Sequence, residues 1–216
     1  MSLKAIGLLG LIGHIAFSST ARAQSGQLAG TPRLLNRDKE IALALSSCPT
    51  AVASKAAVYV LEKSGYLRVR ESANGFTAIV QHPSPTGQAP QCMDAEGTRT
   101  FLPRMLRVAE LRAQGKTEAE TQSIVADAVA KGAIPTPQRP GVIYMLSKEN
   151  IQPTFPPHVM FYGTHLANAD LGVDGRDLGP DGNPTAPTFV PGDGPYALVI
   201  VPVGPHGSEV PQDKRD

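Results

Sequence analysis

Several features that mark common functional classes are scarce or missing in this chain. Its 216 residues include no tryptophan, and only 5% of them are aromatic. Stacking platforms of the kind that hold sugars or single-stranded nucleic acid are therefore in short supply. The formal net charge is +1, and a near-neutral chain lacks the basic excess that drives binding to phosphate backbones. We therefore expect no nucleic acid among its partners.

The chain also lacks a hydrophobic run long enough to cross a membrane. Its N-terminal apolar run, Ala5 to Phe17, has about 13 residues, too few for a hydrocarbon core of about 30 Å. The run follows a lone Lys4 and precedes an A-x-A sequence at 21–23, the three-part pattern of a secretory signal peptide. We predict a signal peptide over residues 1–23, export to the periplasm or the medium, and no membrane span after its removal. Loss of Lys4 and Arg22 leaves 18 basic residues against 19 acidic ones, a net charge of −1.

Cysteine is scarce too, and its two copies are informative. Cys48 and Cys92 make an even count in a chain that we expect to leave the cytoplasm, and disulfides persist in oxidising compartments. We predict a Cys48–Cys92 disulfide. Two buried free thiols are the alternative.

Established catalytic signatures are absent as well. The sequence has no H-E-x-x-H, G-x-S-x-G, S-x-x-K, C-x-x-C or C-x-x-C-H motif. Its carboxylate pairs have simpler explanations, because Glu118 and Glu120 complement the dipole at a helix start and Asp94 with Glu96 fits a turn. These absences favour a protein without a cofactor and without an assembled catalytic site.

The mature sequence is long enough for one hydrophobic core. We divide it into a flexible segment (24–35), a single domain (36–203) and a disordered tail (204–216). Apolar residues recur with helical spacing in the first helix, where Ile41, Ala44, Leu45 and Cys48 share one face. The predicted helices cover about 36–48, 99–115 and 117–132, and a short link joins the last two as a helical hairpin.

Six stretches have the composition and alternation of strands. They are Ala57–Leu61, Tyr66–Arg70, Phe76–Gln81, Gly141–Ser147, His158–Gly163 and Tyr196–Val203. We expect the first three to form a meander and the last, which is apolar on both faces, to lie centrally. The proline-rich or glycine-rich stretches 82–91 and 164–195 are expected to be loops, with His82 at the surface. The predicted fold class is α+β: a single domain with a mainly antiparallel sheet of about six strands and a helical hairpin packed on one face.

Two histidines and an aspartate near the fifth predicted strand invite a metal-site hypothesis. His158 and His165 are seven residues apart in the run HVMFYGTH, and Asp170 follows. Side chains alternate along a regular strand, so this odd spacing directs the two histidines to opposite sides of the sheet. A bulge at Gly163 would reverse that parity and let them converge. His158, Tyr162, His165 and Asp170 are the candidate ligand-binding residues, beside a long loop that suits a binding cleft.

Six short blocks of the sequence resemble blocks shared by a group of exported bacterial proteins of unknown function. They run from about Asn74 to Val203 and read NGFTAIV, CMDAEG, RPGVIYMLS, PPHVMFY, NADLG and LVIVPV. The resemblance implies export and one continuous domain. It implies no activity, cofactor or catalytic residue.

Three functions are compatible with these patterns. The leading hypothesis is an exported cell-envelope protein that binds a small ligand or an envelope partner without catalysis. The second is a metal-assisted hydrolase that uses His158, His165 and Asp170. The third is a structural envelope protein without a pocket. A concave pocket with a few convergent polar groups would favour the first over the third.

Overall fold

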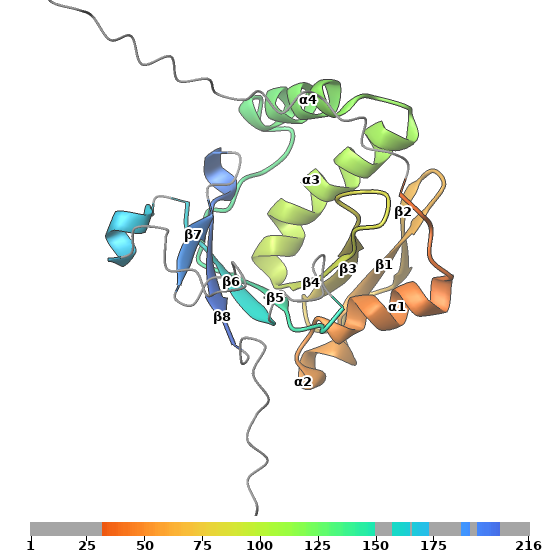
Figure 1. Ribbon diagram of the computed structural model, residues 1–216, viewed down its shortest axis with the longest axis horizontal. Coiled ribbons are helices and arrows are strands. Elements are labelled where there is room, and N and C mark those ends of the chain that lie inside the picture. The colour runs from red at the N-terminus through yellow and green to blue at the C-terminus, as the bar shows by residue number, and fades with distance from the viewer. Residues whose placement is uncertain (1–31, 150–156, 165, 173–186, 191–193, 204–216) are drawn as a thin grey trace, which may run out of the picture.

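A single eight-stranded sheet with helices on both faces forms the described part of the chain (Figure 1). The computed structural model describes residues 32–149, 157–164, 166–172, 187–190 and 194–203. The strand order is β2-β1-β3-β4-β5-β6-β8-β7. The strands are β1 (Ala57–Glu62), β2 (Gly65–Arg70), β3 (Thr77–Gln81), β4 (Ala89–Met93), β5 (Val142–Met145), β6 (His158–Tyr162), β7 (Thr188–Val190) and β8 (Leu198–Pro202). The helices are α1 (Arg37–Ser46), α2 (Thr50–Ala53), α3 (Ala95–Ala113) and α4 (Glu118–Ala130), with short 3-10 turns η1 (Asn168–Leu171) and η2 (Gly194–Tyr196).

The α+β class and the mainly antiparallel sheet are confirmed, but the predicted number of strands is wrong. The sheet has eight strands instead of about six, because β4 and β7 lie in stretches that we expected to be loops. Pro90 is tolerated within β4 because that strand pairs with β5 only at Cys92 and Met93, so the missing N–H falls where β4 has one neighbour. The strand β8 is also not central, since only β7 lies beyond it.

The predicted three-stranded meander is wrong as well. β1 and β2 form an antiparallel hairpin, but β3 lies on the other side of β1 and runs parallel to it. Burial explains this order. Thr77 to Val80 of β3 are all buried, whereas Leu67 and Arg68 of β2 are exposed. A strand that is apolar on both faces is stable inside the sheet, and a strand with an exposed face suits its edge.

One face of the sheet packs against α1. Asn36 caps this helix by accepting from the backbone N–H of Asp38 at 2.9 Å, as a helix start near that residue requires. The predicted disulfide is present: Cys48, just after α1, is bonded to Cys92 of β4 with a Cα–Cα distance of 5.1 Å. The bridge therefore joins α1 to the middle of the sheet.

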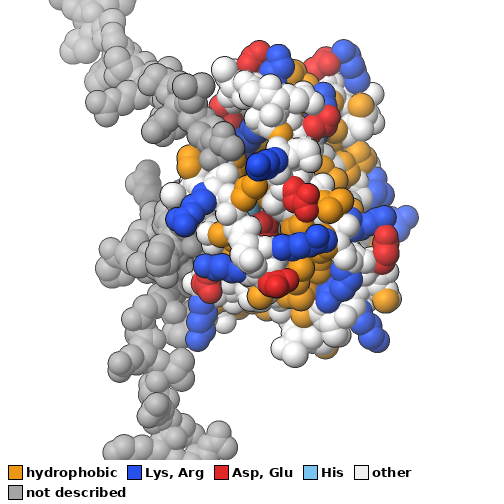
Figure 2. Space-filling model, turned by 90° about the vertical axis from the view of Figure 1, so that its right-hand side faces the viewer, with side chains coloured by type: hydrophobic (Ala, Val, Ile, Leu, Met, Phe, Trp, Pro, Cys, Tyr) orange, Lys and Arg blue, Asp and Glu red, His pale blue; other side chains and the backbone are white. Residues whose placement is uncertain are grey.

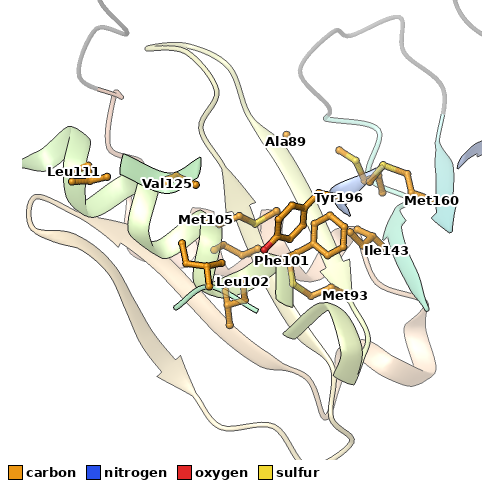
Figure 3. Packing of buried hydrophobic residues seen from close by; sticks show 13 residues of the cluster. Ala89, Met93, Phe101, Leu102, Met105, Leu111, Val125, Ile143, Met160 and Tyr196 are labelled. Atoms are coloured by element: carbon orange, nitrogen blue, oxygen red, sulfur yellow. The ribbon is translucent and has the colours of Figure 1, made fainter. Parts of the chain in front are cut away.

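The opposite face packs against α3. Phe101 of α3 lies 5.1 Å from the ring of Tyr196 between ring centroids, and Figure 3 shows these rings among the side chains of Met93, Ile143 and Met160. The two predicted helices are present, but they do not pack on the sheet together as a hairpin. α3 crosses the sheet, whereas α4 packs on α3 at the top of Figure 1, and α1 and α2 occupy the other face.

None of the helices in the described ranges is both long and apolar enough to cross a membrane. The predicted signal peptide, the segment up to residue 31 and the tail 204–216 lie outside the described residues.

The start of α4 has the capping box that its sequence predicts. The Thr117 hydroxyl accepts from the Glu120 N–H at 3.2 Å, and the Glu120 carboxylate accepts from the Thr117 N–H at 2.9 Å. Hydrogen bonds from the backbone and side chain of Thr117, and then from Lys116, lower the pKa of Glu120 from 4.5 to about 2. The charged form of Glu120 is therefore favoured by folding.

We expect an NMR titration of the Glu120 side chain to give a pKa of about 2. A folded pKa below the unfolded value stabilises the protein above about pH 4.5, and that stabilisation is lost as the pH falls towards 2. Thr117→Ala removes one of the donors and should raise the Glu120 pKa. It should also lower the free energy of unfolding by about 1 kcal/mol, as the loss of an N-cap side chain usually does. A Glu120 pKa near 4.5 in the wild type would contradict the capping box.

Candidate functional site

The predicted binding residues on β6 lie in a regular strand. His158, Met160 and Tyr162 share the face that packs on α3, and His158 pairs with Met145 of β5. The pairing with β8 continues without a bulge through the hydrogen bond from Gly163 N to Ala197 O at 2.9 Å. His158 is only 3% exposed, so it belongs to the packed interior.

The other two candidate metal ligands are Asp170 and His165. Asp170 is exposed in η1, where its carboxylate accepts from the N–H of Ala167 at 2.7 Å. His165 lies outside the described residues, so its convergence with His158 stays a prediction. Within the described ranges, no three His, Cys, Asp or Glu side chains are grouped so that they could hold a metal ion.

Tyr162 has a structural partner that the sequence did not reveal. Its hydroxyl donates to Oδ1 of Asp94 at 2.8 Å, and the same carboxylate accepts from Gly97 N at the start of α3 and from Val142 N of β5. Burial, and then the hydrogen bond and charge of Asp94, raise the pKa of Tyr162. The tyrosine therefore stays protonated and joins β6, β5 and the first turn of α3.

A hollow of about 560 Å³ lies against Tyr162. Thr164, Leu166 and Pro195, from the two ends of the predicted long loop, contribute to its wall. Much of the remaining wall is exposed, including Gln138 and Arg139. A site with such open walls desolvates a ligand poorly.

A deeper cavity lies between the second half of α3 and the β1–β2 hairpin, and we call it the α3 cavity. It has a volume of about 380 Å³, towards the small end of the range for ligand sites, about 300–1,000 Å³. Its α3 wall is one helical stripe, and its other walls come from the N-terminal segment, β1, β2 and the end of β3. The lining residues are Pro32, Leu34, Leu61, Glu62, Lys63, Gly65, Tyr66, Gln81, His82, Arg104, Met105, Val108, Ala109, Arg112 and Ala113.

The floor of the α3 cavity lies where β1 and β3 stop pairing. The pairing of these two strands ends at Tyr59 and Ile79. Beyond that point, the side chain of Glu40 from α1 is the hydrogen-bond partner of β1. Its Oε1 accepts from the N–H of Leu61 at 2.8 Å and lies 3.3 Å from Nε2 of His82. Glu40 is 1% exposed and His82 is 4% exposed, so the prediction that His82 lies at the surface is wrong.

Tyr66 of β2 closes the same end of the cavity. Its hydroxyl donates to the carbonyl of Val80 at 2.5 Å. Burial, and then the negative charge of Glu40, raise the pKa of Tyr66. The tyrosine therefore stays protonated over the neutral pH range and serves as a fixed wall.

Two arginines of α3 supply positive charge to the cavity. Nη1 of Arg112 donates to the carbonyl of His82 at 3.1 Å, and Nη2 donates to Glu118 at 2.9 Å. Burial raises the pKa of Glu118, but the hydrogen bond and charge of Arg112 outweigh it, so that the pKa is lowered. Arg104 lies over the Tyr196 ring at 5.5 Å from its centroid, and burial lowers its pKa.

The α3 cavity therefore combines an apolar centre with fixed polar groups at its ends. Figure 2 looks onto the right-hand side of Figure 1, where β1, β2 and α1 lie, and shows hydrophobic surface with Lys and Arg side chains around it.

No protein-family model, curated protein or solved structure matches this chain.

Proposed function

We propose that this chain is an exported cell-envelope protein that binds a small molecule in the α3 cavity without transforming it. The resemblance to exported bacterial proteins and the predicted signal peptide support export. The Cys48–Cys92 bridge is compatible with it, because structural disulfides are common in oxidising compartments and rare in the cytosol.

The α3 cavity is the observation that carries the proposal. Leu61 and Met105 are buried in its wall, and Val108 and Ala109 add half-buried apolar surface. Removing an apolar ligand from water against such a surface contributes about 25 cal/mol per Å². Most of the surface of the wall is apolar, and convergent polar groups in an apolar pocket are typical of small-molecule sites.

The roles of the polar side chains favour binding over catalysis. His82 contacts Glu40 through Nε2, and the hydroxyl of Tyr66 donates to a backbone carbonyl. A nucleophile next to a base is the usual arrangement for covalent catalysis, and no serine, threonine or cysteine is among the described residues that line the cavity. These polar side chains are therefore placed to shape the cavity and orient a ligand, and not to activate a reacting group.

Uncharged probes test the proposal. We expect 1-naphthol or 1-octanol, at ten times its Kd, to stabilise the protein by about 1.4 kcal/mol and to raise Tm by roughly 3–6 °C. Ala109→Phe places a ring in the cavity and should abolish this rise.

The matched control is Ala119→Phe, at an exposed position of α4 away from the cavity. It should leave the response to both probes unchanged. If neither probe shifts Tm of the wild type, or if Ala109→Phe responds as the wild type does, the α3 cavity is not a ligand site.

A further inference from the structure

We infer that the ligand of the α3 cavity carries an anionic head group, a carboxylate in its simplest form, on a small apolar body. The inference rests on the proposed binding function and names the class of molecule that the site selects. Its support lies in the charges of the wall and in the position of the nearby carboxylates.

The lining residues carry more positive than negative charge. Lys63, Arg104 and Arg112 face one acidic residue, Glu62. Lys63 and Glu62 are adjacent and exposed at the tip of the β1–β2 hairpin, so they offset each other in solvent. The two guanidinium groups of α3 remain as the charged features of the interior wall.

The guanidinium group of Arg112 is not fully paired with the residues that the structure describes. Its two terminal nitrogens are used by His82 O and Glu118, but Nε is buried and has no hydrogen-bond partner among the described residues. A buried N–H without an acceptor costs free energy. Because Nε is buried, a ligand oxygen in the cavity does not reach it directly, and a bound anion would act on Arg112 through the positive charge of its guanidinium group.

Two carboxylates near the cavity, those of Glu118 and Glu40, do not line its wall. Glu118 is absent from the cavity lining and interacts with both Arg104 and Arg112. Glu40 likewise lies behind Leu61 and His82, which do line the cavity. A bound anion would therefore meet the guanidinium groups first, with the carboxylates at a greater distance.

Arg104 points to the same ligand class. It is eight residues before Arg112 on α3, which corresponds to about 12 Å along the helix, and Val108 lies between them on the same stripe. Burial disfavours the charged form of Arg104, so a nearby anion would stabilise it. The apolar body of the ligand would lie along Val108 and Met105.

Three eight-carbon probes that differ only in head group test the inference: octanoate, octanamide and octylammonium. We expect wild-type protein at pH 7 and low salt to bind octanoate about tenfold more tightly than octanamide, and octylammonium most weakly. The preference for octanoate should fall as salt is added, because screening weakens partly exposed charges. Calorimetry or NMR titration measures all three affinities.

Arg112→Met should remove most of the preference, and Arg104→Met a smaller part, because Arg104 lies about 12 Å away along the helix. Both variants should still bind octanamide, which also shows that each is folded. Arg107→Met is the matched control, since Arg107 is on the same helix but does not line the cavity and pairs with Glu110. It should bind octanoate as the wild type does. Equal affinity of the wild type for octanoate and octanamide, or a preference that survives both arginine variants, would overturn the inference. Absence of binding by all three probes would instead remove the proposed binding function.

Discussion

Replacing Cys48 and Cys92 together with alanine is expected to lower the free energy of unfolding by about 4 kcal/mol. The bridge spans 44 residues, and the chain-entropy model gives about 4 kcal/mol for a loop of that length. Alanine is the appropriate replacement, because Cys48 is 7% exposed and Cys92 is 0% exposed. A buried serine hydroxyl would add the cost of an unsatisfied polar group.

Urea unfolding followed by circular dichroism measures this loss. The wild type treated with a reductant should reach the same stability as the double alanine variant, because both lack the covalent link. We also expect faster amide exchange in α1, since Cys48 is the covalent link between this helix and β4. A loss below about 1 kcal/mol would mean that the unfolded chain is little restricted by the bridge.

The elements that sequence predicted well are those fixed by local chemistry. Asn36 and Pro49 bound the first helix, Gly115 and Gly132 have positive φ where α3 and α4 end, and Thr117 begins the capping box. Each of these effects depends on residues within one or two turns. Local patterns were therefore sufficient for these caps. The predicted start of α3 at Arg99 was wrong, because the helix begins at Ala95 and Asp94, which we had assigned to a turn, is its N-cap.

Strand order and one helix face were not predictable in the same way. Nothing in the β2–β3 connection shows that the chain crosses β1, since that order depends on which strand gains more from burial on both faces. The prediction put Ile41, Ala44, Leu45 and Cys48 on the buried face of the first helix. Ala44 and Cys48 are buried, and Ile41 and Leu45 pack half-buried against the same cluster, but Glu40 and Leu43 are more deeply buried than either of these two. Treating Glu40 as a surface residue rotated the expected face by about one residue.

The α3 cavity could not be derived from spacing alone. Its charged and polar residues come from α3, β1, β2 and the end of β3, far apart in the chain. One signal was present: Glu40, Leu43 and Ala44 have i, i+3, i+4 spacing, which places a carboxylate on an apolar helix face. A carboxylate in that position needs a buried partner, and His82 and Leu61 N provide it.

Glu40→Ala is expected to lower the free energy of unfolding by about 3–5 kcal/mol, the usual cost of removing one partner from a buried charged contact. The carboxylate is the acceptor for Leu61 N at 2.8 Å and lies 3.3 Å from Nε2 of His82. Its loss leaves Leu61 N buried without an acceptor, removes the polar partner of His82 and opens a void between α1 and the sheet. The floor of the α3 cavity would be disrupted at the same time.

Glu40→Gln separates the role of shape and hydrogen bonding from that of charge. Glutamine can still accept from Leu61 N, so this variant should lose less stability than Glu40→Ala in urea unfolding. The NMR signals of the His82 ring should change in both variants, because the carboxylate next to Nε2 is gone in each. If Glu40→Ala loses less than about 1 kcal/mol, solvent must reach Leu61 N and His82, since water would then replace the missing acceptor. If Glu40→Ala loses about 3–5 kcal/mol of unfolding free energy and Glu40→Gln loses less, then α1 supports the cavity floor through this one side chain.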